Sequence, residues 1–382
     1  MSRVLFVLRF RESSWEKPGG SYSGYGEYEC NGSYGGDGSL PGGSGKGMSS
    51  GLLNSATFVC DMLNSFGDGI EAKLVQVANN NEIYKEINKF SPSHVIIEAL
   101  FVVPSKFAEL IPLYPHIKWI VRNHSELSFL QSEGIACQWI FQYLAYEQMA
   151  VSSNSPRADE ELKFLASTIF PSWDEKRLHE KLPYLPNYYP IDRTYQGPKQ
   201  IDPNKEWISI GCFGAIRPLK NHLEQAVAAI KFAVQHGYKL RFHINATRIE
   251  GRGDAILKNL RKLFEHLDPN AFLLVEHGWM DHECFLKLCS TIDLLLQVSF
   301  SETFNIVGSD CVSVGVPVVG SKEIPWLPKQ FHADPTSSTD IARVMAHAWH
   351  VWTSEDPARE LTAKYLSEYS AQTQAIWYDH FA

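Results

Sequence analysis

Short apolar runs alternate with amphipathic, helix-length segments along most of the chain. In the first half, each apolar run is typical of a buried strand, and the segment after it carries apolar residues at a helical period. The expected strands cover 3–10, 71–77, 94–99, 117–122 and 148–152, and the expected helices cover 50–66, 80–90, 104–113, 138–146 and 156–165. Because strands that alternate with helices build parallel sheets, this half predicts a Rossmann-like domain.

The second half restarts the same alternation after a segment rich in proline. The expected strands cover 207–213, 239–245, 272–276 and 293–298, with one more that begins at 317–319. The expected helices cover 221–236, 254–266 and 281–290, and a further helix-length segment lies between the last two strands. Two further helices are expected over 338–354 and 356–377, and a linker over 186–205. The pattern therefore predicts an α/β protein with two Rossmann-like domains that face each other across a cleft.

Length and composition agree with this division. At 382 residues the chain is too long for one ordinary core and fits two domains of about 150 to 200 residues. Hydrophobic residues make up 44% of it, and no apolar run reaches the length of a transmembrane helix. The apolar start is cut by Arg9 and Arg11 and has no small-residue cleavage site, so it indicates a first strand and not a signal peptide.

Charge and cysteine content limit the expected binding partners and the expected cellular compartment. The net charge of −8 gives no general attraction to nucleic acid or to anionic membranes. The seven cysteines are odd in number and scattered, which argues against a disulfide framework and favours a reducing, cytoplasmic location. No integral membrane segment is expected.

Residues 11–48 depart from the alternation, because Gly and Ser dominate them and tyrosines are spaced between. A loop of this length between a first strand and a first helix is either a functional lid or a disordered segment, and the sequence leaves both open. Its end does not match a phosphate-binding P-loop, since Gly47 follows Lys46 where that pattern requires Ser or Thr. The helix that begins near Ser49 or Ser50 nevertheless offers free backbone N–H groups to an anion.

Two acids near the end of the second half are candidate ligand-binding groups. Glu302 follows the expected strand over 293–298, at the end of the sheet where ligands of parallel sheets bind. Asp310 lies eight positions later, close to two helical turns, so both carboxylates can face one cleft. The alternative is that two acids near a helix start merely favour the helix dipole.

A basic turn and a histidine occupy similar positions at strand ends. Arg217 and Lys220 lie between the expected strand 207–213 and the next helix, where a guanidinium, an ammonium and helix N–H groups can hold a diphosphate together. Solvated surface charges are the alternative. His124 follows the strand over 117–122, and it is either structural or part of a site at that sheet edge.

The second half resembles the donor-binding domain of GT-B glycosyltransferases, and specifically the retaining family 4 enzymes. The resemblance rests on the turn 214–221, on GWMDHECFLKLCSTID and on DLLLQVSFSETFNIVGSDCVSVGVPVVGS. Glu302 and Asp310 represent the E-x7-E signature. In the first half, the resemblance rests on the alternation of strands and helices, on His124, and on the segments SSNS and LPNYYP. Two positions depart from the family pattern: Asp310 replaces a glutamate, and ETFN replaces EGFG.

The resemblance implies a role for each site residue. Glu302 would contact hydroxyls of the donor sugar and Asp310 those of the ribose, while Arg217 and Lys220 would stabilise the departing diphosphate. His124 would position the donor sugar or the acceptor. The implied catalytic residues are His124, Glu302, Arg217 and Lys220. The implied donor-binding residues are Gly214, Arg217, Lys220, Asn221, Trp279, Met280, Glu302, Thr303, Phe304, Asn305, Ile306 and Asp310, with Trp279 and Met280 near the nucleobase.

The same resemblance implies the domain organisation and the cofactors. It places an acceptor domain at 1–190 and a donor domain at 191–360, with the last helix, 361–382, packing back on the first domain. The family retains anomeric configuration and generally needs no metal, so no metal and no cofactor are expected beyond the nucleotide-sugar, a UDP- or GDP-sugar.

Several functions stay open at this point. The leading expectation is a hexosyl- or pentosyltransferase. A sugar-nucleotide epimerase, a phosphorylase and a non-catalytic nucleotide-sugar-binding protein are the alternatives. The acceptor is expected to be a sugar, a metabolite, a protein or a modified nucleic-acid base, and the sequence does not indicate the oligomeric state.

Overall fold

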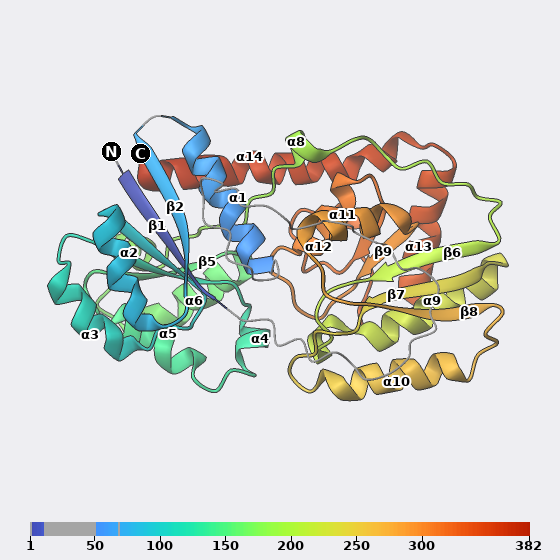
Figure 1. Ribbon diagram of the computed structural model, residues 1–382, viewed down its shortest axis with the longest axis horizontal. Coiled ribbons are helices and arrows are strands. Elements are labelled where there is room, and N and C mark those ends of the chain that lie inside the picture. Colours follow the sequence, from blue (N-terminus) through green and yellow to red (C-terminus); the bar gives the residue numbers. More distant parts are fainter. Residues whose placement is uncertain (1, 11–50, 68) are drawn as a thin grey trace, which may run out of the picture.

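The computed structural model describes residues 2–10, 51–67 and 69–382. They form two α/β domains that lie side by side along the long axis of the molecule (Figure 1). The expected lid or disordered loop over 11–48 falls outside the described residues.

Five parallel strands form the sheet of the first domain, in the order β2-β1-β3-β4-β5. The strands are β1 (Ser2–Arg9), β2 (Ile70–Val77), β3 (His94–Glu98), β4 (Lys118–Asn123) and β5 (Met149–Ser153). The helices are α1 (Gly51–Ser65), α2 (Ile83–Phe90), α3 (Pro104–Leu113), α4 (Leu127–Leu130), α5 (Ala136–Leu144), α6 (Pro156–Ile169) and α7 (Glu175–Lys181). Successive residues of β1, from Val4 to Val7, are fully buried, as expected for a parallel strand covered on both faces.

The second sheet is also parallel, with the order β10-β9-β6-β7-β8. Its strands are β6 (Trp207–Cys212), β7 (Lys239–Asn245), β8 (Phe272–His277), β9 (Leu294–Gln297) and β10 (Val318–Gly320). The helices that follow α7 are α8 (Ile191–Thr194), α9 (His222–His236), α10 (Gly253–Glu265), α11 (His282–Thr291), α12 (Ile306–Ser313), α13 (Ser338–Thr353) and α14 (Leu361–Phe381). The expected strands and helices are confirmed to within a few residues, whereas α4, α7 and α8 were not expected.

In each sheet the strand order reverses beside the first strand of the domain. β1 lies between β2 and β3, and β6 lies between β7 and β9. Ligands of α/β sheets bind outside the carboxyl ends of the strands at such a reversal. Residues that follow β1, β3, β6 and β9 line one common cleft, so the two reversal points face each other between the domains.

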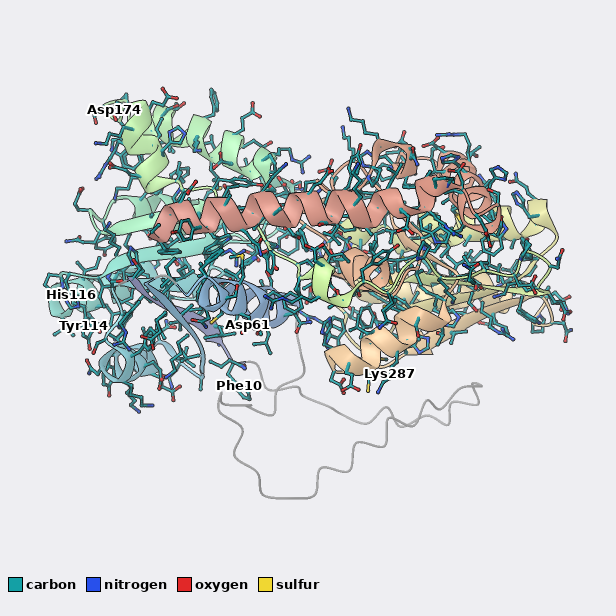
Figure 2. The ribbon with its side chains drawn as sticks, turned by 90° about the horizontal axis from the view of Figure 1, so that it is seen from above. Phe10, Asp61, Tyr114, His116, Asp174 and Lys287 are labelled. Carbon is teal, nitrogen blue, oxygen red and sulfur yellow. The ribbon has the colours of Figure 1, made fainter. Side chains whose placement is uncertain are left out.

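The last helix, α14, runs along both domains (Figure 2). Its end packs in the first domain, where Trp377 and Phe381 join a buried cluster with Val4 and Phe6 of β1. Ser2 donates a hydrogen bond from its hydroxyl to the carbonyl of Phe381 over 2.7 Å, so the two ends of the described chain lie together (Figure 1).

A buried ammonium ties α7 to the first sheet. The Nζ atom of Lys181 lies 3.3, 2.5, 3.1 and 2.9 Å from the carbonyl oxygens of Leu144, Tyr146, Glu147 and Met149, which share its three N–H donors. Burial lowers the pKa of Lys181 to about 8. These four acceptors compensate for the desolvation of the charge and fix the turn that leads into β5.

Most of the described cysteines are free of disulfide bonds. Cys60, Cys137, Cys212, Cys289 and Cys311 are free, whereas Cys284 is disulfide-bonded and so departs from the expectation. Within the described ranges, no helix combines the length and the apolar character that crossing a membrane requires.

Candidate functional site

The cleft between the domains has a volume of about 890 Å³ and is lined by both carboxyl-end sheet edges. Every residue expected in the site lines it except Asn221. The Asn221 backbone is left-handed, with φ of 59°, and its amide donates to the carbonyls of Val298 and Pro335 at 3.2 and 2.7 Å. Asn221 therefore joins the basic turn to the loops behind it.

An ion pair joins the basic turn to the acid after β9. The Nζ atom of Lys220 lies 2.5 Å from Oε1 of Glu302, and the two side chains are only 11% and 7% exposed. Gly214 begins the turn with φ of 115°, a conformation that favours glycine, and its N–H donates to Oδ1 of Asn245 over 3.0 Å. The turn thus presents Lys220 to the cleft while Glu302 holds its ammonium in place.

Arg217 reaches from the same turn across the cleft. Its guanidinium carbon lies 4.6 Å from the centre of the Phe129 ring in the first domain, and Nη1 lies 3.4 Å from Oε2 of Glu250. The Nε atom is buried and has no hydrogen-bond partner among the described residues. A guanidinium held over an aromatic ring with one N–H unpaired can donate a hydrogen bond to an anion bound in the cleft.

The N-terminus of α12 faces the cleft beside Glu302. Asn305 caps the helix: its Oδ1 accepts from the N–H of Gly308 over 2.7 Å, and its Nδ2 donates to Oε1 of Gln297 over 2.9 Å. The φ angle of Asn305 is 66°, a left-handed conformation that Gly and Asn adopt most easily. The replacement of EGFG by ETFN therefore preserves this backbone bend. The first residues of α12, Ile306 and Val307, line the cleft, where free helix N–H groups can bind an anion.

Asp310 lies at the back of the cleft and already has two partners. Its Oδ1 accepts from the hydroxyl of Tyr189 at 2.9 Å and lies 2.7 Å from Nε2 of His282. Burial raises the pKa of Asp310 although both partners oppose the shift, and the carboxylate in turn raises the pKa of His282 against the effect of burial. Tyr189 and His282 were not among the expected residues. Tyr189 lies in the segment LPNYYP and His282 in the segment GWMDHECF, but no spacing rule connects either segment to Asp310.

His124 belongs to a buried polar network in the first domain. Its Nε2 lies 2.5 Å from Oε2 of Glu98, and its Nδ1 lies 3.1 Å from Nδ2 of Asn154. Burial raises the pKa of Glu98, but Arg122, with Nη1 3.3 Å from Oε1, and His124 together outweigh it and hold the pKa of that carboxyl low. Burial lowers the pKa of His124, so a neutral ring donates from Nε2 and accepts at Nδ1. Both ring nitrogens are thus occupied by protein groups.

Several contacts bridge the domains around this network. The hydroxyl of Thr303 donates to the carbonyl of His124 over 3.2 Å, and the hydroxyls of Ser128 and Ser301 lie 2.7 Å apart. Arg157 pairs with Glu126 of its own domain and with Glu323 of the other, at 3.0 and 2.7 Å. These contacts hold the two walls of the cleft together.

Trp279 and Met280 line the cleft at the end of the second domain nearest β8. The guanidinium carbon of Arg248 lies 4.7 Å from the centre of the Trp279 ring, and the backbone N–H of Trp279 donates to the hydroxyl of Thr247 over 2.8 Å.

No group of three or more His, Cys, Asp or Glu side chains in the described part of the chain is placed to hold a metal ion.

Sequence comparisons give no relatives: no family model matches the chain, and no curated protein matches it. Comparison of structures does give similar proteins. The N-terminal domain of Candida albicans trehalose-6-phosphate phosphatase aligns with a TM-score of 0.65 at 9% identity, over 99% of this chain and 96% of that one. A UDP-forming α,α-trehalose-phosphate synthase from Burkholderia vietnamiensis aligns at 0.56 and 13%, over 75% and 73%. Sucrose-phosphate synthase from Thermosynechococcus elongatus aligns at 0.55 and 14%, over 85% and 91%.

These identities are too low to indicate function, but the structural alignments establish the fold. The two parallel sheets of five strands match the paired Rossmann-like domains of GT-B proteins. The chain therefore has the GT-B fold that the sequence pattern predicts.

Proposed function

We propose that this protein is a retaining glycosyltransferase that uses a UDP- or GDP-sugar. The observation that carries the proposal is the Lys220–Glu302 pair, which lies where the strand order of the second sheet reverses. A carboxylate that binds sugar hydroxyls and a cation that meets a diphosphate are the two groups that a nucleotide-sugar requires at its scissile bond.

The chemistry of transfer fits these residues. When the anomeric C–O bond breaks, negative charge grows on the leaving diphosphate, and donors already aimed at that charge lower the barrier. Lys220, Arg217 and the first residues of α12, Ile306 and Val307, all line the cleft. These two cations and the helix N–H groups would stabilise the negative charge of the leaving diphosphate without a metal ion.

Glu302 has a second task in this proposal. Its Oε1 holds Lys220, so its other oxygen can accept hydrogen bonds from the donor sugar. By contacting both Lys220 and the sugar, Glu302 would fix the position of the sugar relative to the diphosphate. His124 would act through its backbone and its network, since both ring nitrogens are engaged. The acceptor would enter from the first-domain wall and would be a sugar, a metabolite, a protein or a modified base.

Ligand binding and product analysis test the proposal together. Thermal shifts with UDP, GDP, ADP and their sugars should identify one nucleotide, because a ligand of the folded state raises its apparent stability. ¹H NMR of the donor that binds should then show slow hydrolysis with retained anomeric configuration. Interconversion of the donor without release of nucleotide would instead indicate an epimerase, and binding without any turnover a nucleotide-sugar-binding protein.

A further inference from the structure

The second acid of the E-x7-E pair, Asp310, is almost fully buried at the back of the cleft. Asp310 is 2% exposed, and one of its oxygens, Oδ1, already accepts from Tyr189 and faces His282. A glutamate would extend one methylene further. A carboxylate that is shorter, buried and already bonded on one oxygen is poorly placed to accept two adjacent ribose hydroxyls.

His282 is the exposed member of this group. It is the first residue of α11, directly after the capping residue Asp281, and its side chain is 26% exposed to the cleft that Asp310 also lines. Its Nε2 is fixed on Asp310, and Nδ1 makes no hydrogen bond to any residue in the described part of the chain.

The ring of His282 is also held from a second side. Phe58 of α1 packs against it with 5.8 Å between ring centres, and the same Phe58 packs edge-on against Tyr189 at 5.3 Å. In Figure 2 α1 and α11, marked by Asp61 and Lys287, lie on the same side of α14. The orientation of the imidazole is therefore set by Asp310 and by apolar packing before any ligand binds.

We infer that His282, oriented by Asp310, presents its Nδ1 to the ribose hydroxyls of the nucleotide in place of the second carboxylate. The inference rests on the proposed function, because it concerns the nucleotide of the same donor. A hydroxyl both donates and accepts, so it can pair with Nδ1 whether the imidazole is neutral or protonated. Asp310 is then a positioning residue, and His282 is the group in contact with the ligand.

Ribose-modified nucleotides test this assignment directly. Binding of UDP and GDP, each beside its 2′-deoxy and 3′-deoxy forms, is measured by calorimetry on the full chain and on three variants. His282→Phe keeps the ring packing and removes both nitrogens, His282→Gln retains an amide near Nε2 but none near Nδ1, and Glu283→Gln is the matched control. Glu283 is the next residue of α11, and its side chain is 81% exposed.

We expect wild type and Glu283→Gln to bind one ribonucleotide about three- to tenfold more tightly than at least one deoxy form, the value of one hydrogen bond. His282→Phe and His282→Gln should both lose this preference while still binding the nucleotide, with thermal denaturation confirming that they are folded. Retention of the wild-type preference in both variants would overturn the inference and leave the proposed function standing. Failure of the wild-type protein to bind either nucleotide would instead overturn the proposed function.

Discussion

The ammonium of Lys220 lies 2.5 Å from the carboxylate of Glu302, although 82 positions separate the two residues in the chain. The pair forms because β6 and β9 are neighbours in the sheet and both end at the cleft. A sheet whose strand order reverses between these two strands brings their following loops together, and the fold thereby places opposite charges at one point.

Removing the carboxylate of Glu98 should destabilise the first domain. Both Arg122 and Glu98 are fully buried, so Glu98→Gln leaves the guanidinium without its ionic partner and should cost about 3 kcal/mol of unfolding free energy. Urea denaturation measures the loss. Glu86→Gln, which removes one half of an exposed pair with Lys89, should change stability by less than about 0.5 kcal/mol. Equal effects of the two substitutions would contradict a stabilising role of the buried Glu98–Arg122 pair.

The left-handed backbone of Asn305 predicts an order among substitutions. Asn305→Gly and Asn305→Ala both lose the cap and the bond to Gln297, but glycine removes the Cβ from this left-handed residue whereas alanine keeps it. Alanine should therefore be less stable than glycine by about 1 kcal/mol in urea denaturation. An alanine variant as stable as the glycine variant would show that the bend is not strained.

The end of α14 should be essential to the first domain. Trp377 is fully buried, its indole donates to the carbonyl of Pro186 over 2.8 Å, and it packs on Phe6 of β1. Trp377→Ala should lower the unfolding free energy by about 3–5 kcal/mol through the cavity it leaves. Tyr378→Ala, at the exposed neighbouring position, is the control. A small effect at Trp377 would mean that the first domain closes its core without this helix.

Acid should weaken the second domain through a buried histidine pair. His243 and His277 stack with 5.2 Å between ring centres, and burial lowers their pKa values to about 3 and about 4. Between about pH 6.5 and pH 4 the unfolded chain binds more protons than the folded one, so the unfolding free energy falls as the pH is lowered. His277→Gln should flatten this slope, measured by denaturation at a series of pH values. The exposed His179→Gln should leave it unchanged, and a wild-type slope in His277→Gln would refute the assignment.

The sequence predicted the sheets because parallel strands buried on both faces are short continuous apolar runs. It predicted the cleft residues because polar groups placed directly after such strands must gather at one sheet edge. Glu302, Lys220 and Arg217 are all of this kind.

Contacts made across the fold were not predictable in the same way. Helix α7 was missed because EKRLHEK shows no apolar stripe, and its last residue, Lys181, is buried through backbone carbonyls that only the folded chain assembles. Asn221 was expected at the donor from its position, which gave no sign that its amide donates to the carbonyls of Val298 and Pro335. The partners of Asp310 are Tyr189 and His282, which lie 121 and 28 positions away in the chain and meet it only in the folded protein.

The most direct test of the central claim is donor turnover by Lys220→Met, followed by ¹H NMR with the UDP- or GDP-sugar that stabilises the wild type. Methionine keeps most of the side-chain volume and removes the charge. The double variant Lys220→Met/Glu302→Gln also removes the carboxylate that would be left unpaired, so a loss of turnover in it is not caused by an unpaired buried charge that destabilises the fold. The exposed Lys287→Met is the matched control. We predict that both Lys220 variants are folded and slower than wild type by at least about 100-fold, while the control is unchanged. Wild-type turnover in a folded Lys220→Met protein would contradict the account.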